Sequence, residues 1–352
     1  MKAVVLRGPN NFELHDDVAV PQPGRGQVLL KVRSTTMCGT DQKIVAGQFP
    51  GTPFPHIPGH EFAGEVVELG EGADGAISVG ARVGVEVHVG CGRCPRCLEG
   101  LYQLCSNYGH PELGHAHIGF TVPGGLAEFV AVPVQAVHQL PDALNWDQGA
   151  FCDNIGIALY AVERGRLRPG EQVVVIGPGA FGALAVQVAH AMGAARVILV
   201  GTRAERVRRL QHLADAVVVG SDDDDAIRQT RLALGGDGGA DLVIEFAGTP
   251  AAARQAIQLA RRGGRVVLAG ATGPGRELRG VDLSTIVRGH LAIYGSLANP
   301  RGISRRGLQL MARGAVDVSP LITHHFPLAQ FADAWATFVE RRDGAIRVML
   351  HP

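Results

Sequence analysis

The 352-residue sequence has no excess of charge of either sign and no long hydrophobic run. Its 33 Lys and Arg residues balance 33 Asp and Glu residues, which excludes the basic surface that nucleic acids and anionic membranes attract. No apolar stretch approaches the roughly 18 residues of a membrane-spanning helix, and the one at the N-terminus is too short for a signal peptide. We therefore expect a soluble, cytoplasmic protein that binds neither nucleic acid nor membrane.

Cysteines are also few, but four of the six lie within fifteen residues. Zinc in a closed structural site prefers four thiolates in a tetrahedron, and three cysteines at every third residue followed by a fourth can wrap one ion. Disulfides would instead suit a secreted and usually smaller protein. The spacing predicts a structural zinc ion held by Cys91, Cys94, Cys97 and Cys105.

The length predicts two domains, and the pattern of the sequence changes near Gly170. Earlier, β-branched runs at 28–32, 64–69 and 82–89 are bounded by Gly, Pro and Asp, which is typical of strands. Later, strand-like and helix-like segments alternate as in βαβ units, which predicts an α/β domain with a parallel sheet. The elements expected there are strands at 173–176, 197–200, 241–246 and 265–270, and helices at 181–192 and 250–262. The aspartates at 222–225 indicate the solvated start of a helix.

A glycine-rich turn joins the first of these strands to the first helix. Its sequence, Gly177-Pro178-Gly179-Ala180-Phe181-Gly182, is typical of a dinucleotide-binding fingerprint in this strand–turn–helix context. The first glycine permits the tight turn, the second lets the backbone approach a pyrophosphate, and Gly182 lets helix and strand pack closely. An ordinary glycine-rich turn is the alternative.

The second strand of this region ends without the acidic residue that an NAD site usually has there. The sequence instead reads Val200-Gly201-Thr202-Arg203. Gly201 leaves room for a 2′-phosphate, Thr202 can donate a hydrogen bond to it, and Arg203 can pair with its charge. We therefore predict NADP rather than NAD. Alternatively, Arg203 merely begins a basic, solvated helix.

Three further residues have the chemistry of a catalytic zinc site, which takes three protein ligands and keeps a fourth position open. They occur in Cys38-Gly-Thr-Asp41, in Gly59-His60-Glu61 and in Cys152-Asp153. Each also has an ordinary interpretation. Cys38 fits a small buried hydrophobe, His60 a hydrogen-bonded core histidine, and Asp153 a helix cap.

Together these motifs resemble the zinc-dependent medium-chain dehydrogenase/reductase family over essentially the whole chain. The resemblance is carried, in this order, by Cys38-Gly-Thr-Asp41, Gly59-His60-Glu61-x-x-Gly64, the four clustered cysteines, Gly124-Gly-Leu-Ala-Glu128-Phe129 and the glycine-rich fingerprint. Within the family the chain most resembles the threonine and polyol dehydrogenases. Glu86-Val-His88 and Pro320-Leu-Ile-Thr-His324 are similar to threonine dehydrogenases, whereas the 201–203 turn resembles NADP-dependent secondary alcohol dehydrogenases.

The resemblance implies a GroES-like catalytic domain at 1–153 and 297–352, interrupted by a Rossmann cofactor domain at 154–296, with the active site in the cleft between them. It places the catalytic zinc on Cys38, His60 and Asp153, with Glu61 as an adjacent, exchangeable ligand. Cys152 is a rival third ligand, but Asp153 precedes Tyr160 by the seven residues typical of the carboxylate position.

The resemblance also implies roles around these ligands. Asp41 would hydrogen-bond the far nitrogen of His60 and so fix its tautomer. Arg347 matches a position that contacts the cofactor pyrophosphate, although it could be an exposed strand residue. Ala247 and Gly270 would join the fingerprint residues around the cofactor.

The function implied is zinc-dependent hydride transfer from a secondary alcohol to NADP⁺, with Thr40 accepting the alcohol proton. The histidine that commonly ends this relay is replaced by Lys43. Four histidines could substitute for it, although each fits a surface loop: His56, His110, His115 and His117.

The expected substrate is a polyol, cyclitol, sugar derivative or amino alcohol. The alternatives are an NAD-dependent L-threonine 3-dehydrogenase and, in another class, a non-catalytic zinc-stabilised binding protein. The resemblance implies a dimer or tetramer, and a strand at 291–294 could extend a sheet across a two-fold axis.

Overall fold

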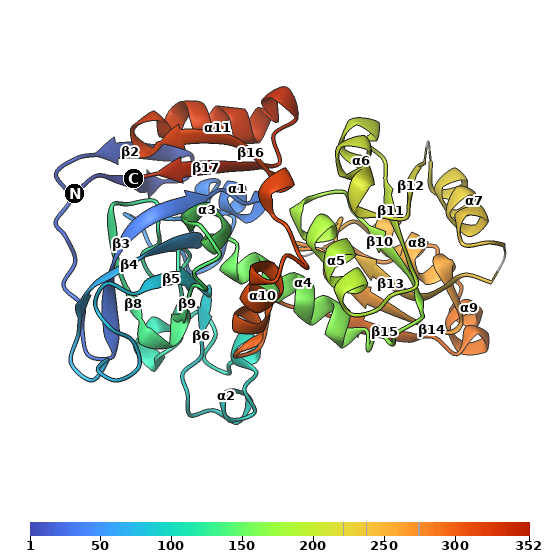
Figure 1. Cartoon of the computed structure of the whole chain (residues 1–352), viewed down its shortest axis with the longest axis horizontal. Coiled ribbons are helices and arrows are strands. Elements are labelled where there is room, and N and C mark those ends of the chain that lie inside the picture. Colours follow the sequence, from blue (N-terminus) through green and yellow to red (C-terminus); the bar gives the residue numbers. More distant parts are fainter. Residues whose placement is uncertain (221, 237, 274) are drawn as a thin grey trace. The chain divides into compact units, whose positions relative to one another are not determined.

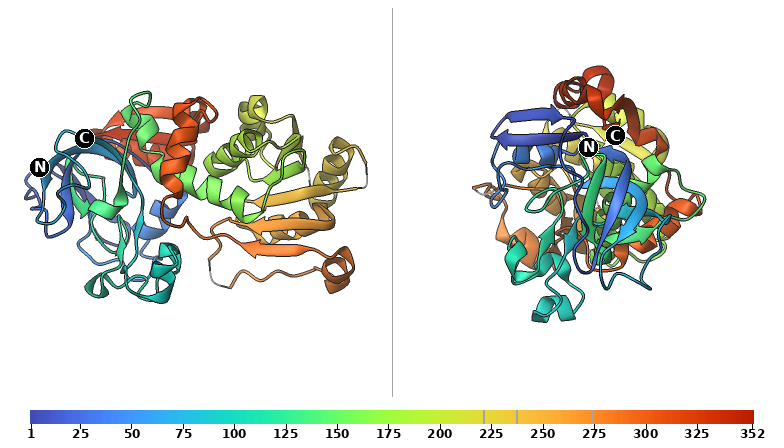
Figure 2. Two further views of the ribbon diagram at one scale, coloured as in Figure 1. Left: turned by 60° about the horizontal axis from the view of Figure 1, so that its bottom comes forward. Right: turned by 90° about the vertical axis from the view of Figure 1, so that its left-hand side faces the viewer.

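The computed structural model describes residues 1–220, 222–236, 238–273 and 275–352, which form two compact units (Figure 1). The first unit comprises residues 1–156, 299–312 and 321–352, and the second comprises residues 157–298 and 313–320. Both chain termini belong to the first unit, where they lie near each other (Figure 2). The chain first passes from one unit to the other within helix α4 (Cys152–Arg164).

A seven-stranded sheet forms the centre of the first unit. Its strands follow the order β16-β17-β3-β4-β5-β9, and β8 also pairs with β3. Separate two-stranded sheets join β1 to β2 and β6 to β7. The strands are β1 (Ala3–Gly8), β2 (Asn11–His15), β3 (Gln27–Thr36), β4 (Glu61–Leu69), β5 (Arg82–Val85), β6 (His88–Val89), β7 (Ala116–His117), β8 (Phe129–Pro133), β9 (Val137–Gln139), β16 (Ile322–Pro327) and β17 (Arg347–His351).

Alternating apolar residues build the core of this unit. Val28, Leu30 and Val32 of β3 point to one face of the strand and are buried with Phe62 of β4. Short helices and turns connect the strands: α1 (Gly39–Val45), α2 (Pro95–Leu98), η1 (Tyr102–Leu104), η2 (Pro111–Leu113), η3 (Val134–Ala136), α3 (Trp146–Gly149), α10 (Ile303–Ala312), η6 (Leu328–Gln330), α11 (Phe331–Glu340) and η7 (Arg342–Gly344). A further turn, η5 (Ser319–Leu321), spans the boundary of the two units.

The second unit is built on a six-stranded sheet in which every pair is parallel. The strand order β12-β11-β10-β13-β14-β15 is that of a doubly wound dinucleotide-binding sheet. Its strands are β10 (Gln172–Ile176), β11 (Arg196–Gly201), β12 (Ala216–Val219), β13 (Ala240–Glu245), β14 (Ala260–Leu268) and β15 (Ala292–Gly295). Its helices are α5 (Ala180–Ala191), α6 (Ala204–Leu210), η4 (Gln211–Leu213), α7 (Asp223–Ala233), α8 (Pro250–Leu259) and α9 (Leu283–Gly289).

The predicted α/β fold class is confirmed, but two predicted elements need correction. The helix expected over 250–262 ends at Leu259, because Ala260 already pairs with Ala240 of the neighbouring strand. The strand expected over 82–89 is two strands, because β5 pairs with β4 and β9 whereas β6 pairs with β7. In both places pairing between distant segments overrides the local pattern. None of the described helices is long and apolar enough to cross a membrane.

Candidate functional site

The start of helix α1 holds Cys38 and orients a histidine through Asp41. One carboxylate oxygen of Asp41 accepts the backbone N–H of Cys38 at 2.7 Å, and the other lies 3.1 Å from Nδ1 of His60. All three residues are buried. Burial lowers the pKa of His60, but the Asp41 carboxylate outweighs it and raises that pKa well above its ordinary value. The Asp41 bond leaves Nε2 of His60 available as a metal ligand, as the sequence predicts.

Cys38, His60 and Glu61 converge on one point. Each offers a ligating atom, and these atoms all lie within 4.8 Å of one another. The turn before β4 sets this arrangement, because Gly59 has a φ of 97° and an added Cβ there would lie 2.7 Å from the backbone nitrogen of Leu126. A thiolate, an imidazole and a carboxylate that are all buried suit zinc.

Two side chains hold Glu61 in place. Nη1 of Arg347 donates to Oε2 of Glu61 at 2.6 Å, and Nδ2 of Asn154 donates to Oε1 at 2.6 Å. Arg347 also donates to the carbonyl oxygen of Met37, and it is only 3% exposed. The alternative that Arg347 is an exposed strand residue is therefore wrong. Neither Asn154 nor the Glu61–Arg347 pair was expected, because no local pattern links positions so far apart.

Asp153 and Cys152, the two candidate third ligands, differ in their surroundings. Asp153 is buried outside the group formed by Cys38, His60 and Glu61, and its Oδ1 accepts the backbone N–H of Val87 at 3.1 Å. Burial raises the pKa of Asp153 to about 7. Cys152 packs on Gly84, because a Cβ added to Gly84 would lie 2.6 Å from the Cβ of Cys152. Burial raises the pKa of Cys152 well above its ordinary value, which opposes the thiolate that a metal needs.

Helix α1 also carries the two residues predicted for proton transfer. Oγ1 of Thr40 lies 3.7 Å from Sγ of Cys38, so its hydroxyl is next to the proposed metal ligands. Lys43 is one turn further along the same helix and is partly buried. Residues three apart lie on one helix face, so Thr40 and Lys43 are neighbours on the surface of α1.

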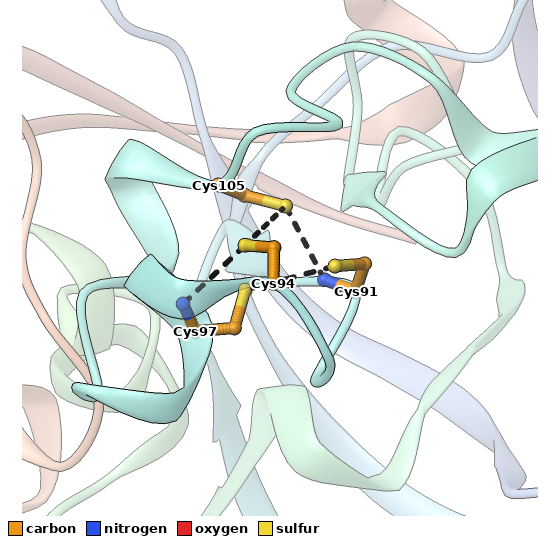
Figure 3. A group of neighbouring side chains, drawn as sticks. All are labelled: Cys91, Cys94, Cys97 and Cys105. Atoms are coloured by element: carbon orange, nitrogen blue, oxygen red, sulfur yellow. Dashed lines mark hydrogen bonds between the residues drawn. The ribbon is translucent and has the colours of Figure 1, made fainter.

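The four clustered cysteines point toward one another in a loop around the short helix α2 (Figure 3). The Sγ atoms of Cys91 and Cys97 are 4.0 Å apart, as are those of Cys94 and Cys105. These separations are close to the edge of about 3.8 Å that a tetrahedron with zinc–sulfur bonds of about 2.3 Å would have. All four are free thiols rather than disulfides.

The loop backbone stabilises the thiolate of Cys94, whereas burial raises the pKa of Cys97 to about 12 and that of Cys105 above its ordinary value. Sγ of Cys94 accepts the backbone N–H groups of Ser106 at 3.4 Å and of Cys97 at 3.5 Å. These bonds lower the pKa of Cys94 to about 5. Gly90 leaves the space that the cluster fills, because an added Cβ there would lie 2.4 Å from Sγ of Cys97. The residues present therefore fit the predicted structural zinc ion.

A cluster of buried histidines adjoins the Cys38–His60 site, which corrects their assignment to surface loops. His56, His115 and His117 are at most 4% exposed, and only His110 is exposed. Loop position in the sequence did not reveal this burial. The alternation of histidine with apolar residues in His115-Ala116-His117-Ile118 was the signal in the sequence that could have indicated buried histidines.

Ring stacking connects the histidine cluster to His60. His117 stacks on His88 at 4.3 Å and on Phe120 at 3.7 Å between ring centroids, and Phe120 lies 4.7 Å from the ring of His60. The hydroxyl of Tyr108 is 3.2 Å from Nδ1 of His117. Burial lowers the pKa of His88 to about 3 and that of His117 well below its ordinary value. The cluster is therefore polar but uncharged at neutral pH.

In the second unit, the glycine-rich turn between β10 and α5 has little room for side chains. Gly177 has a φ of 114°, a left-handed conformation that favours glycine. An added Cβ on Gly182 would lie 2.0 Å from the carbonyl oxygen of Gly177. By contrast, an added Cβ on Gly179 meets nothing within 4 Å. The turn therefore packs helix on strand through Gly182 and leaves the backbone at Gly179 open, as a pyrophosphate site requires.

At the end of β11, packing explains why position 201 is a glycine, which the sequence did not suggest. An added Cβ there would lie 2.4 Å from Cγ of Pro178, so packing against the fingerprint turn excludes a side chain. Thr202 and Arg203 follow and are exposed. Burial and the neighbouring charge of Arg203 lower the pKa of Arg206. Two arginines whose charges repel each other favour an anion beside them.

The remaining predicted cofactor residues lie at the carboxyl ends of the sheet strands. Ala247 follows β13, and its backbone nitrogen would lie 2.9 Å from an added Cβ on Gly177. Gly270 follows β14 against Gly248, whose N–H bonds to Glu245 at 2.6 Å. The rings of Phe181 and Phe246 stack at 5.9 Å. These residues gather at one end of a parallel sheet, where nucleotides bind in such folds.

The fold and the two clusters of ligating residues define a metal- and dinucleotide-dependent oxidoreductase. Residues 24–142 match the alcohol dehydrogenase GroES-like domain, and residues 180–313 match the zinc-binding dehydrogenase family. The chain belongs to the zinc-dependent alcohol dehydrogenase family, and it is an oxidoreductase that acts on CH–OH donors. The first unit has the GroES-like fold and the second has the Rossmann-type fold.

Individual relatives support this membership over the full length. A sorbitol dehydrogenase from Halalkalibacterium halodurans is 31% identical over 360 residues, covering 100% of this chain and 99% of that protein. An L-threonine 3-dehydrogenase from Pyrococcus horikoshii is 32% identical over 348 residues, covering 95% of this chain and 94% of that protein. A solved zinc-binding dehydrogenase from Sinorhizobium meliloti, bound to NADP, matches with a TM-score of 0.87 and 31% identity, covering 100% and 99%.

Proposed function

We propose that the protein catalyses the reversible oxidation of a secondary alcohol to a ketone, with NADP⁺ as the hydride acceptor and zinc at Cys38, His60 and Asp153. The observation that carries the proposal is the buried convergence of Cys38 and His60 with Glu61, the adjacent ligand we propose, together with the Asp41 carboxylate 3.1 Å from Nδ1 of His60. Asp153 is buried outside this group but interacts electrostatically with His60 and Glu61, and it is our candidate for the third ligand. A purely structural site would be closed by four protein ligands. The cysteine cluster has that composition and so would hold a second, structural zinc ion.

Each residue at the catalytic site would have a distinct task. Bound zinc would supply Lewis acidity that lowers the pKa of the substrate hydroxyl, and NADP⁺ would supply the hydride acceptor. Thr40, adjacent to Cys38, would accept the hydroxyl proton and pass its own proton onward. Lys43, one turn away, would hold a second hydroxyl or an anionic group of the substrate.

Glu61 and Asp153 would share the carboxylate role. The Arg347 pair and the Asn154 amide hold Glu61 beside Cys38 and His60, which suits an adjacent and exchangeable ligand. Asp153 is a buried carboxylate, and burial raises its pKa to about 7 by disfavouring the charged form, which a bound cation would offset. Cys152 is the weaker candidate, because it packs on Gly84 as a thiol.

Cofactor preference follows from the turn after β11. Pro178 excludes the acidic side chain at position 201 that would bind a ribose hydroxyl. Thr202 and Arg203 are exposed at the start of α6, and Arg206 stands beside Arg203. These groups suit a 2′-phosphate, and the NADP-bound Sinorhizobium meliloti structure is similar in fold. Arg347, held beside Glu61, remains our candidate for contacting the pyrophosphate.

The substrate class is a polyol, cyclitol, sugar derivative or amino alcohol. The histidine cluster next to His60 offers neutral hydrogen-bonding groups, such as the hydroxyl of Tyr108 and the rings of His117 and His88. Such groups suit additional hydroxyls on the substrate. NAD-dependent L-threonine 3-dehydrogenase is the second candidate, because relatives with that name match most of the chain. Lys43 in place of the relay histidine disfavours it.

We also propose that the protein is a homodimer or homotetramer. Strand β15 pairs only with β14 among the described residues, so its outer edge is open to a second copy. Leu283 and Val287 on the neighbouring helix α9 are 72% and 76% exposed and lie four residues apart on one face. We place the protein in the cytoplasm, where its free thiols would stay reduced.

A screen of secondary alcohols with NADP⁺ and NAD⁺ tests the proposal. The panel would contain hexitols, a cyclitol, sugar phosphates, 2,3-butanediol and L-threonine, and reduced cofactor would be followed by absorbance. We expect oxidation of at least one polyol or sugar derivative with a preference for NADP⁺. If L-threonine with NAD⁺ were the best pair, the second candidate would replace the first.

A further inference from the structure

A third group of metal-ligating side chains lies in the first unit. Asp147, His325 and His351 each offer one ligating atom, and these atoms all lie within 4.8 Å of one another. The group shares no residue with the Cys38–His60 site or with the cysteine cluster. It unites three elements that are distant in the sequence, namely α3, β16 and β17.

The sheet brings the two histidines onto one face. Strands β16 and β17 are parallel neighbours, and His325 stands opposite Met349. His351 is two residues beyond Met349, and side chains two apart on a strand point the same way. The imidazole rings stack with centroids 5.5 Å apart and planes inclined by 8°.

Asp147 is held in position by helix α3 and by a buried hydroxyl. It lies in the first turn of α3, which is fixed by the capping box of Asn145 and Gln148. The hydroxyl of Ser34, a fully buried residue of β3, donates to Oδ1 of Asp147 at 2.5 Å. A carboxylate that is oriented by a buried hydroxyl resembles the supported ligands of metal sites.

The distances suit a three-ligand site that faces solvent. Nε2 of His351 lies 2.8 Å from Oδ1 of Asp147, and Nδ1 of His325 lies 3.5 Å from Oδ2. The side chain of Asp147 is 21% exposed, and that of His325 is 53% exposed. An ion could therefore reach the cluster from solution, with water completing its coordination.

We propose that Asp147, His325 and His351 form a surface site for a divalent transition-metal ion, with Zn²⁺ as the ion expected. Two imidazoles and one carboxylate are borderline ligands that suit Zn²⁺ and its first-row neighbours. Mg²⁺ and Ca²⁺ prefer oxygen ligands and would bind poorly. The site would hold a third ion, in addition to the structural and catalytic zinc ions.

A simple histidine–aspartate ion pair accounts for less of the geometry. The bond from His351 to Asp147 would suffice for such a pair, and it gives no reason for His325 to lie against the other carboxylate oxygen. A metal ion requires both rings to be neutral and uses the same three groups together.

Binding would connect the C-terminal strands to α3 and so stabilise the first unit. An ion that binds only the folded chain raises its stability in proportion to the logarithm of its concentration. The effect would be independent of catalysis, because none of the three residues belongs to the proposed catalytic machinery.

The test counts zinc ions in the zinc-loaded, full-length protein. Wild type, His325→Gln and a His325→Gln/His351→Gln double variant would be dialysed against Zn²⁺ at free concentrations up to the order of 100 µM, and bound metal measured by mass spectrometry. His212→Gln, which changes an exposed histidine outside the cluster, is the matched control. His325 is itself half exposed, so the single variant preserves the test if the double variant fails to fold.

We expect wild type and His212→Gln to bind one ion per chain more than His325→Gln or the double variant. The thermal midpoint should also rise with Zn²⁺ in the first pair and rise less in the second. Equal numbers of bound ions in wild type and His325→Gln would overturn the proposal. This holds at every Zn²⁺ concentration tested.

Discussion

Glu61 and Arg347 form a buried ion pair, with Nη1 of Arg347 2.6 Å from Oε2 of Glu61, although 286 positions separate them in the sequence. Their side chains are 1% and 4% exposed. Removing one partner of such a pair leaves a buried charge uncompensated, which typically costs about 3–5 kcal/mol. The pair therefore couples the C-terminal strand to the start of β4, where the proposed zinc ligands lie.

We predict that Arg347→Leu lowers the free energy of unfolding by about 3–5 kcal/mol, measured by urea denaturation. Adding Glu61→Gln to this variant should restore part of the loss, because the unpaired charge is then removed. Arg342→Leu is the matched control, since its pair with Glu340 is exposed to solvent and should contribute little to stability. Equal losses in Arg347→Leu and Arg342→Leu would contradict the prediction.

The cysteine cluster offers a test that removes no ligand. Gly90→Ala would place a Cβ 2.4 Å from Sγ of Cys97 and 2.9 Å from the ring of Tyr102, so the thiolates must move. We predict that this variant loses the zinc ion proposed for the cluster to a chelator at least about tenfold faster than wild type. Gly8→Ala, which meets nothing within 4 Å, is the control. If both variants released zinc at the wild-type rate, Gly90 would have no part in the site.

Acid should destabilise the protein through its buried histidines. Burial lowers the pKa of His88 to about 3 in the folded chain, whereas a histidine in the unfolded chain titrates near 6.5. Only the unfolded state takes up this proton between these values. The contribution of His88 is therefore complete above pH 6.5 and is lost as the pH falls below it, by about 1.4 kcal/mol per pH unit.

The measurement is the free energy of unfolding at several pH values between about 7 and 5. His88→Gln should reduce the slope of stability against pH by about one proton per molecule. A slope in His88→Gln that matches the wild-type slope would show that His88 is protonated in the folded chain.

Arg203 should determine the preference for NADP⁺. A charge-assisted contact to a 2′-phosphate contributes about 1.5–3 kcal/mol, so Arg203→Ala should lower kcat/KM for NADP⁺ by about 10- to 100-fold. The same variant should change kcat/KM for NAD⁺ little, because NAD⁺ lacks that phosphate. Arg208→Ala on the same helix is the control. A wild-type protein that uses NAD⁺ at least tenfold more efficiently than NADP⁺ would refute the role of Arg203.

Local patterns in the sequence predicted the parts of the structure that depend on short spacing. The cysteine cluster occupies one loop, so its spacing alone indicated a shared ion. The fingerprint turn required glycine for steric reasons that the structure shows at Gly177 and Gly182. The bond from Asp41 to His60 followed from motif resemblance, since only the fold places those residues together.

Other features could not be predicted because they depend on tertiary packing. The burial of His115 and His117 depends on strands and rings that pack over their loop, and the loop residues give little sign of it. The Glu61–Arg347 pair and the Asp147–His325–His351 group each join segments more than 150 residues apart. Gly201 is a further example. The sequence suggested that this glycine leaves room for a 2′-phosphate, whereas the structure shows that Pro178 packs against it and excludes a side chain.

The most direct test of a catalytic zinc at Cys38 is to compare wild type with Cys38→Ser for bound zinc and for alcohol-dependent reduction of NADP⁺. The assay would use protein dialysed against a chelator weak enough to leave the structural and catalytic ions in wild type. We predict two ions per chain in wild type and one in Cys38→Ser, with activity lost by a factor of at least about 1,000. One ion in both proteins, or full activity in Cys38→Ser, would contradict the account.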